Sequence, residues 1–322
     1  MPKNIYLLTS KKASEILRVH ESSIKRWSNL GELPSQVTLG GHRRIVWDDL
    51  MLYAAQHAIR HDYSDFEASA FEVYCAKENY LKSSSLQPFL DLISEWMASG
   101  QLNSLHLLLF YMVEELKIPF FRLADELIFP SMVLIGHWWE QGIIDMAQEH
   151  LLSQEWNHTL NVLRHKKNLS TPPKSLTGQQ AILACSDENT HELALHCLRI
   201  LCEERGFGVI FLGARVPDQQ LKACIERENP TLVAVSFSPL DLTQALQRSY
   251  QTLAGVQPQQ AFALAFGGGN VCRDSKNVAD VNEFEDCGDL QFSSLTASPF
   301  ITRFGHFKSM QDFCHWLELE KS

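Results

Sequence analysis

His191 is the residue of this sequence that is best placed to bind a metal ion. It follows the apolar run 181–185 across the polar stretch 186–190, and a helix-like stretch begins at about the same position. A short apolar run followed by helical periodicity indicates a strand and a helix of an α/β domain, where ligands bind beyond the carboxyl ends of the strands. A histidine on that connecting loop can reach a metal that the fold itself does not enclose. His191 is therefore a candidate metal ligand.

Small residues end the third and fourth apolar runs of the same region and leave a groove for a nucleotide-like tail. They are Ser236, Ser238, Gly267 and Gly268. The glycines come at the fourth strand rather than the first, so they are not a dinucleotide-binding fingerprint, and no P-loop lysine is present. A receiver domain needs acidic residues at the ends of the first and third strands, which Asp187 and Asp241 imitate only weakly.

A large aromatic side chain ends an apolar stripe farther upstream. The stripe consists of Ile128, Met132, Ile135 and Trp139, which fall on one face of a predicted helix. Such a stripe is normally core, but an aromatic residue at its end can project onto a flat ligand. Glu149 and His150 follow in the next helix. A glutamate there can bind a ribose hydroxyl, whereas a histidine is more often a structural hydrogen-bond partner.

The head, residues 1–60, has the pattern of a small DNA-binding domain. A turn at 18–20 joins two short helices, and a hairpin that turns at Gly40 and Gly41 follows them. In a helix-turn-helix the second helix lies in the major groove, and a basic wing can contact phosphates. Thr9 or Ser10 is expected to cap the first helix and Asp48 the third. The predicted DNA contacts are Ser22, Ser23, Lys25, Arg26, His42, Arg43 and Arg44.

Charge is distributed unevenly along the chain. The 322 residues carry a formal net charge of −10, whereas the head has nine lysines and arginines against five acidic residues. A basic head on an acidic body suits a protein that touches phosphates with its head alone. The acidic remainder would resist non-specific binding to DNA.

Composition and cysteine usage predict a cytoplasmic protein that does not bind membranes. No run of about 18 apolar residues indicates a membrane span, and the N-terminus lacks the apolar core of a signal peptide. The eight cysteines are scattered without a C-x-x-C pair. We therefore expect reduced thiols rather than disulfides or zinc ligands.

The order of the predicted elements indicates a multidomain protein of class α and α/β. Four helix-like stretches between 86 and 165 are joined by short links, which favours an antiparallel four-helix bundle, with a kink at Pro130. Apolar runs that alternate with helix-like stretches after 178 predict a parallel α/β sheet. The expected segments are a winged helix-turn-helix head (1–60), a helical connector (61–85), a four-helix bundle (86–165), a linker (166–178) and an α/β domain (179–322).

The head resembles the MerR/excisionase superfamily of winged helix-turn-helix domains. The resemblance rests on YLLTS at 6–10, IKRW at 24–27 and GGHRR at 40–44, and it covers nearly all of 5–60. It implies binding to double-stranded operator DNA, as a dimer or higher oligomer at repeated sites.

The α/β domain resembles the cobalamin-binding Rossmann-like domain, in which an Asp/Glu-x-His-x-x-Gly motif supplies the lower axial ligand of cobalt. NTHELA at 189–194 matches this motif at His191 and departs from it at Asn189 and Ala194. The family's acidic residue orients the histidine and raises its basicity, so the uncharged Asn189 predicts weaker ligation. The resemblance implies that Asn189 and His191 lie beneath the cobalt. It also implies a slot for the dimethylbenzimidazole that is lined by Ser236, Ser238, Gly267 and Gly268.

Trp139, Glu149 and His150 form a W-x9-E-H pattern that resembles the light-responsive, adenosylcobalamin-dependent MerR regulators of the CarH/LitR type. LADELI at 123–128 and AQEHLLS at 147–153 also resemble that family, so the resemblance spans almost the whole chain. It implies that the three residues cap the upper face of the corrin around the 5′-deoxyadenosyl group. Glu140 stands where this family often has a histidine that binds cobalt after photolysis, which argues against a bis-histidine adduct.

Three functions from different classes fit these observations. The first, which we favour, is a non-enzymatic, cobalamin-dependent and light-responsive transcriptional regulator. It is expected to be a repressor that binds operator DNA as a dimer or tetramer and takes adenosylcobalamin as its cofactor. The second is a MerR-type regulator whose C-terminal half has lost cobalamin or binds another ligand. The third is a corrinoid methyl carrier, which residues 1–60 argue against, because such carriers have no DNA-binding head.

Overall fold

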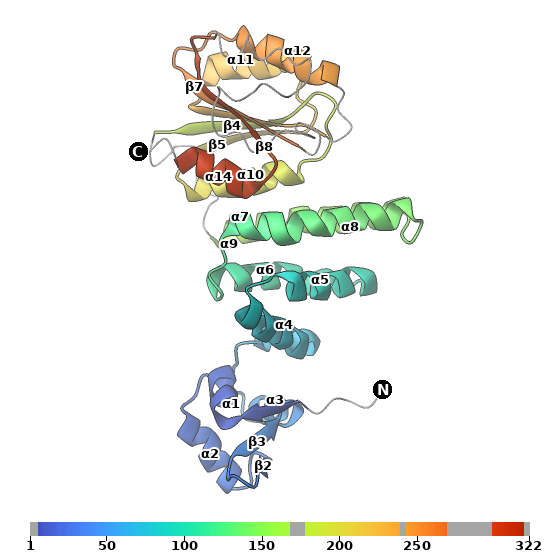
Figure 1. Cartoon of the computed structure of the whole chain (residues 1–322), viewed down its shortest axis with the longest axis vertical. Coiled ribbons are helices and arrows are strands. Elements are labelled where there is room, and N and C mark those ends of the chain that lie inside the picture. Colours follow the sequence, from blue (N-terminus) through green and yellow to red (C-terminus); the bar gives the residue numbers. More distant parts are fainter. Residues whose placement is uncertain (1–5, 168–177, 239–242, 269–297, 319–322) are drawn as a thin grey trace. The chain divides into compact units, whose positions relative to one another are not determined.

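The computed structural model describes residues 6–167, 178–238, 243–268 and 298–318, which belong to two compact units (Figure 1). The N-terminal unit comprises Met1–Leu108 and the C-terminal unit Leu109–Ser322. Nothing in the described part of the chain is a helix long and apolar enough to cross a membrane.

The head folds as three helices and a small antiparallel sheet of strand order β1-β3-β2. The strands are β1 (Leu7–Thr9), β2 (Gln36–Val37) and β3 (Arg43–Val46), and the helices are α1 (Ser10–Leu17), α2 (Glu21–Asn29) and α3 (Trp47–Gln56). The Thr9 hydroxyl accepts a hydrogen bond from the Lys12 N–H at 3.1 Å, so the predicted cap of α1 is confirmed. The predicted cap of α3 is wrong, because α3 begins at Trp47 and Asp48 lies in its first turn. A carboxylate in that turn still favours the helix through the helix dipole.

The segment that follows the head packs on it through aromatic side chains. This segment contains the 3₁₀-helix η1 (Ser64–Ser69) and α4 (Ala70–Ser83). Trp47 lies against Tyr63, Phe71 and Tyr74, with ring centroids 5.9, 5.3 and 4.9 Å apart. The expected helicity of 61–85 is therefore present, and the segment also contributes to the core of the N-terminal unit.

Helices continue from the N-terminal unit into the C-terminal one. They are α5 (Gln87–Ser99), the 3₁₀-helix η2 (Leu102–Ser104), α6 (Leu105–Glu114), α7 (Phe120–Leu123), the π-helical turn η3 (Ala124–Ile128), α8 (Phe129–Glu140) and α9 (Met146–Lys166). Pro130 was expected to kink one long helix, and it lies in the first turn of α8 directly after η3. Because proline clashes with the carbonyl four residues before it, a widened π turn can accommodate its ring. The packing of these helices into a single four-helix bundle stays a prediction.

The C-terminal unit contains a parallel five-stranded sheet of order β5-β4-β6-β7-β8. Its strands are β4 (Gln180–Cys185), β5 (Gly208–Gly213), β6 (Leu232–Ser236), β7 (Phe262–Gly267) and β8 (Ile301–Phe307). Helices α10 (Leu193–Glu204) and α14 (Met310–Glu318) cover one face, and α11 (Asp218–Glu228) and α12 (Thr243–Ala254) cover the other (Figure 1). This doubly wound order confirms the Rossmann-like α/β expectation.

Four of the five strands occur where apolar runs predicted them, and the core lies between the sheet and its helices. Side chains of α11 and α12, such as Leu221 and Leu253, are buried against strand residues such as Val233 and Leu264. The fifth strand, β8, was not predicted. The expected helix start at His191 is wrong, because α10 begins at Leu193 and His191 remains in the preceding loop.

Candidate DNA-binding and ligand-binding sites

Helix α2, the second helix of the predicted helix-turn-helix and its expected recognition helix, is capped by the ring of His20. Its Nδ1 accepts a hydrogen bond from the Ser22 backbone N–H at 3.2 Å and lies 2.7 Å from the Ser22 hydroxyl oxygen. The ring thus takes the position in which serine, threonine or aspartate most often caps a helix. Because Nδ1 accepts from a backbone N–H, its neutral tautomer carries the proton on Nε2.

The predicted DNA contacts on α2 differ in exposure. Ser22, Lys25 and Arg26 are exposed, whereas Ser23 is half-buried. Lys25 Nζ lies 2.9 Å from the Glu21 carboxylate one turn earlier, and this hydrogen bond lowers the pKa of Glu21. The exposed face therefore carries a hydroxyl, an arginine and a lysine that already has an acidic partner.

The wing is a tight hairpin whose turn is held by Thr38. The Thr38 N–H donates to the His42 carbonyl at 2.9 Å, and the Gly41 N–H donates to the Thr38 carbonyl at 2.8 Å. The His42 N–H also reaches the Thr38 hydroxyl at 3.2 Å. Gly41 has a φ of +76°, a conformation that favours glycine. The hairpin is therefore held through three hydrogen bonds, with His42 exposed beside its tip.

The two arginines of the wing are half-buried. Arg43 donates a hydrogen bond to the side-chain carbonyl of Asn29, the last residue of α2. Arg44 donates to the Arg43 carbonyl at 3.3 Å. The Arg43–Asn29 bond ties the wing to α2, and no pattern in the sequence predicts this bond. The assignment of both arginines to phosphate contacts stays a prediction.

The structure brings three of the predicted ligand-site residues together at the carboxyl edge of the large sheet, where β4 to β8 end. Asn189 is 1% exposed, and its amide nitrogen donates to the Ser236 carbonyl at 3.0 Å. Its amide oxygen accepts from the His191 backbone N–H at 2.9 Å. Asn189 therefore holds the backbone of the histidine loop and does not contact the imidazole.

The imidazole of His191 projects from a loop whose backbone is fixed. The residue is exposed, and its carbonyl accepts a weak hydrogen bond from the Cys185 thiol, with sulfur and oxygen 3.5 Å apart. Within the described residues its ring nitrogens have no hydrogen-bond partner. A neutral imidazole in that state has a lone pair available for a ligand.

Gly267 ends β7 beside Ser236 at the end of β6, and Gly268 follows it. Gly268 has a φ of +140°, and a Cβ there would lie 2.1 Å from the Phe237 carbonyl oxygen. At Gly267 a Cβ would make an ordinary contact of 3.5 Å with the Phe307 carbonyl oxygen. Gly268 thus allows two backbone segments to approach closely. Ser238, two residues after β6, is buried, and the slot predicted from these residues stays a prediction.

Glu192 is a further residue of this edge that the sequence did not indicate. Its carboxylate accepts a hydrogen bond from the Ala214 N–H at 2.6 Å. A Cβ at Gly213 would lie 2.4 Å from the same carboxylate oxygen, so this glycine makes room for it. The contact joins the loop before α10 to the loop after β5.

Trp139, Glu149 and His150 lie at the end of α8 and the start of α9. Asp145 caps α9 in a capping box with Gln148. Glu149 accepts from the Ser153 hydroxyl at 2.7 Å, and its other oxygen lies 2.7 Å from His150 Nδ1. Trp139 is 49% exposed. The glutamate–histidine pair is therefore formed, and within the described residues no hydrogen bond or ring contact joins Trp139 to it.

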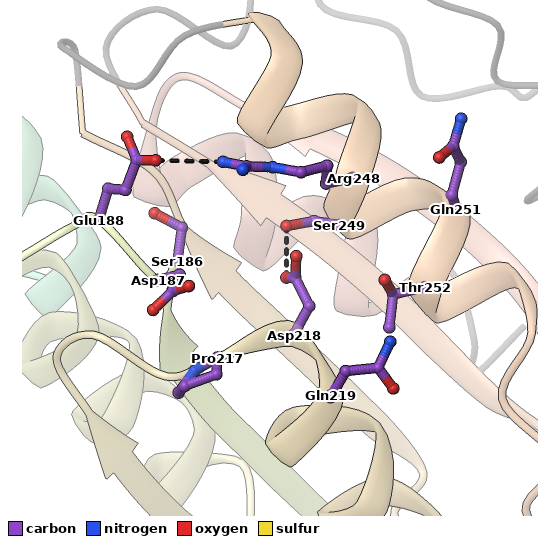
Figure 2. Close-up of a pocket in the computed structure, with 10 residues that line it drawn as sticks. All are labelled: Ser186, Asp187, Glu188, Pro217, Asp218, Gln219, Arg248, Ser249, Gln251 and Thr252. Carbon is purple, nitrogen blue, oxygen red and sulfur yellow. Dashed lines mark hydrogen bonds and ion pairs between the residues drawn. The ribbon is translucent and has the colours of Figure 1, made fainter.

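An open pocket of about 300 Å³ lies between the loop after β4, the start of α11 and the helix α12 (Figure 2). In this pocket the Ser249 hydroxyl donates to Asp218 at 2.6 Å, and Arg248 lies 3.1 Å from the Glu188 carboxylate. Burial raises the pKa of Asp218, and the Ser249 hydrogen bond opposes that shift. None of the ligand-site residues predicted from the sequence lines this pocket. Its lining residues are Ser186, Asp187, Glu188, Pro217, Asp218, Gln219, Arg248, Ser249, Gln251 and Thr252.

Helices of the C-terminal unit pack directly on its α/β fold. The Asp125 carboxylate in η3 accepts hydrogen bonds from the N–H groups of Met310 at 2.8 Å and Gln311 at 2.9 Å, at the start of α14. Burial raises the pKa of Asp125, and the two N–H groups oppose that shift. Arg164 of α9 lies 2.6 Å from Glu203 of α10. These contacts fix α9 and η3 to the α10/α14 face of the sheet.

No group of three or more histidine, cysteine, aspartate or glutamate side chains that could hold a metal ion occurs among the described residues. A single axial ligand needs no such cluster. The six described cysteines are free thiols, and burial raises the pKa of the Cys197 and Cys202 thiols well above the usual value. Cys272 and Cys287 lie outside the described residues.

Comparison with known proteins identifies relatives of part of the chain. Residues 7–58 match a family described as a helix-turn-helix domain. The chain is 31% identical to the HTH-type transcriptional repressor CarH of Myxococcus xanthus over 140 residues, which are 42% of this chain and 45% of the relative. It is 34% identical to the HTH-type transcriptional repressor CarA of the same organism over 99 residues, which are 30% of this chain and 33% of that relative.

Among solved structures, a monomethylamine corrinoid protein of Methanosarcina barkeri overlaps 73% of this chain and the whole of its own, with 14% identity and a TM-score of 0.49. The chain spans less than half the length of the two repressors that it matches. It carries a helix-turn-helix domain at residues 7–58 and is, over that part of their length, a relative of the HTH-type transcriptional repressors CarH and CarA.

Proposed function

We propose that this chain is a DNA-binding transcription regulator whose C-terminal unit binds a cobalamin. The observation that carries the proposal is the winged helix-turn-helix head, in which an exposed recognition helix and a basic wing are tied together by Arg43 and Asn29. The names of the two relatives favour repression. The chain would act without catalysis, in the cytoplasm, and would bind double-stranded operator DNA as a dimer or tetramer.

The carboxyl edge of the sheet fits a cobalamin at its lower face. His191 offers an exposed imidazole whose ring nitrogens have no partner within the described residues, and its loop is fixed through Asn189. A bound cobalamin would supply a cobalt ion, and the His191 imidazole would be the protein group that holds it. The role of His191 is therefore to offer a ring nitrogen, and Asn189 positions its backbone. Ser236, Ser238, Gly267 and Gly268 are proposed to lie along the tail of the cofactor.

We assign the upper face of the cobalamin to Trp139, Glu149 and His150. An exposed indole can stack on a flat ligand, and the Glu149 carboxylate can accept hydrogen bonds from ribose hydroxyls. His150 holds that carboxylate from the other side at 2.7 Å. We accordingly propose adenosylcobalamin as the physiological form and light as the signal. Glu140, next to Trp139, supplies no imidazole for the cobalt, and the nearby histidine of α8 is the exposed His137, two residues before Trp139.

To test the cobalamin proposal, the full chain is incubated with adenosylcobalamin in the dark, and excess ligand is then removed. We expect retained corrinoid absorption, a change of spectrum on illumination, and a change of oligomeric state and DNA affinity with it. DNA sites are first obtained by selection from a random duplex library. The His191→Ala variant is expected to bind the same DNA sites as the parent chain in the absence of cobalamin. It is expected to bind the cofactor more weakly.

A second candidate is a regulator of the same DNA-binding type without cobalamin. This candidate is favoured because the Asn189 side chain bonds to backbone groups. The His191 imidazole therefore lacks the carboxylate partner that orients a metal-binding histidine in the related motif. Loss of all corrinoid on desalting, combined with sequence-specific DNA binding, would establish this candidate. Equal dark and lit affinities of a cobalamin-loaded chain would reject light as the signal.

A further inference from the structure

Asn189 joins the loops that follow three neighbouring strands at the carboxyl edge. Its own loop follows β4, and its amide nitrogen bonds to the Ser236 carbonyl at the end of β6. Its backbone carbonyl accepts from the Arg215 N–H at 3.0 Å, in the loop after β5. Its amide oxygen holds the His191 N–H. The side chain and the backbone carbonyl of this one buried residue therefore connect β4, β5 and β6 beside the proposed cobalt ligand.

The hydrogen-bond pattern requires one donor and one acceptor at this position, which an amide supplies at any pH and a carboxyl group supplies only when it is protonated. The Ser236 carbonyl needs a donor and the His191 N–H needs an acceptor, and Asn189 supplies one of each. The flipped amide would place oxygen against the Ser236 carbonyl and nitrogen against the His191 N–H, so the orientation is fixed. An ionised carboxylate has no donor and would place a charge, 99% buried, against a carbonyl oxygen.

The Ser236 carbonyl also holds Ser186, the first residue of the loop after β4. The Ser186 N–H donates to the Ser236 carbonyl at 2.9 Å, and the Asn189 N–H donates to the Ser186 carbonyl at 3.0 Å. Both lone pairs of the Ser236 oxygen are thus used, one by Ser186 and one by Asn189. All these partners belong to the protein, so the hydrogen bonds that hold the loop need no ligand.

We infer that Asn189 is a positioning residue that fixes the histidine loop in advance, and that restoring the acidic residue of the related motif at this position damages the site. The related motif places an acid here to orient the imidazole. In this chain Asn189→Asp would break the bond to Ser236 and release the loop. The inference rests on the proposed function only where it concerns cobalamin, because the bonds that hold the loop join protein groups alone.

The first test measures hydrogen–deuterium exchange of 186–192 in the full chain without cobalamin. Asn189→Asp and Asn189→Ala are both expected to speed exchange of the His191 amide by at least about tenfold, because a buried hydrogen-bond network has lost a member. His191→Ala is expected to leave the protection of this amide unchanged, once the exchange rate is corrected for the new side chain, because Asn189 binds the backbone N–H of that residue. Asn229→Asp, at the opposite edge of the sheet, is the matched control for the same chemical change.

The second test titrates hydroxocobalamin into each variant and follows the visible spectrum that reports imidazole coordination. Asn189→Asp is expected to bind at least about tenfold more weakly than the parent chain and to show less of the coordinated spectrum, since the competent loop is populated less. Tighter binding by Asn189→Asp, or exchange of 186–192 equal to that of the parent, would overturn the inference. If the parent binds no cobalamin, the proposed cofactor is wrong, and the exchange measurement alone decides the role of Asn189.

Discussion

Individual side chains at the carboxyl edge are fixed mainly by backbone groups of neighbouring loops. Asn189 bonds to the Ser236 carbonyl and the His191 N–H, and Glu192 bonds to the Ala214 N–H. Gly268 lies so close to the Phe237 carbonyl that it has no room for a side chain. The position of the candidate ligand His191 therefore depends on the residue types at 189, 192 and 268. Most other side chains at these positions could not make the same hydrogen bonds or would not fit.

Gly268→Ala is predicted to destabilise the C-terminal unit by about 3 kcal/mol. The added methyl group would meet the Phe237 carbonyl oxygen at 2.1 Å, and the backbone has a φ of +140°, so strain and overpacking combine. Differential scanning calorimetry of the full chain measures the loss as a lower melting temperature. Gly267→Ala, whose Cβ has an ordinary contact, is the control and should cost less than about 1 kcal/mol. Equal effects of the two substitutions would contradict the prediction.

Secondary-structure elements of this chain were predictable where burial leaves a simple pattern. β4, β6 and β7 are almost wholly buried and appear as short apolar runs. β8 escaped prediction because its sequence includes Thr302, Arg303 and His306. His306 is buried, and its ring is hydrogen-bonded to Tyr250 of α12. The local sequence around His306 does not reveal this partner.

The candidate sites were predictable only in part for the same reason. Residue type and position indicated His191 and the exposed face of α2, both of which the structure leaves accessible. The His20 cap, the Arg43–Asn29 bond and the Asn189 contacts depend on tertiary placement of loops. No periodicity or composition encodes such contacts, so the sequence indicated candidate residues without indicating how they are held.

The junction between η3 and α14 is predicted to weaken as pH rises through the pKa of Asp125. Burial raises that pKa above its usual value of 3.8, so the folded state binds the proton more tightly than the unfolded state does. The stabilisation from this group is complete below the unfolded pKa and is lost as pH rises through the folded one. Asp125→Asn lacks this titration and keeps one acceptor for the α14 N–H groups.

The measurement compares the melting temperature of the C-terminal unit in parent and Asp125→Asn chains from acid to neutral pH. The variant should gain stability relative to the parent as pH increases. A difference that is constant over this range would show that Asp125 does not titrate as its burial implies.

The whole molecule combines a basic head with an acidic remainder, and this division predicts how it meets DNA. The head carries nine basic and five acidic residues within a chain of net charge −10. Attraction to phosphates should therefore come from the head, while the rest of the chain repels the duplex. Specificity would then depend on a small set of side chains on α2 and the wing.

DNA affinity of the full chain is predicted to fall steeply with salt, and Lys25→Ala should reduce the slope of log affinity against log salt by about one. Lys25 is exposed on α2, although Glu21 lies 2.9 Å from it. Fluorescence anisotropy with a selected duplex over a range of salt measures the slope. Lys117→Ala, which removes an exposed lysine from the C-terminal unit, is the control and should leave the slope unchanged.

The π-helical turn at Ala124–Ile128 holds one residue more than an α turn would. Because the turn absorbs this residue locally, the helical residues before and after it keep nearly the facing that an unbroken α-helix would give them. Deleting one residue from the turn should therefore restore a regular helix and leave Trp139 on nearly the same side. Deleting one residue inside α8 would instead rotate the indole by about 100° about the helix axis, since each residue of an α-helix turns the chain by that angle. A change of one residue in chain length is therefore tolerated best at this turn, where Asp125 holds α14.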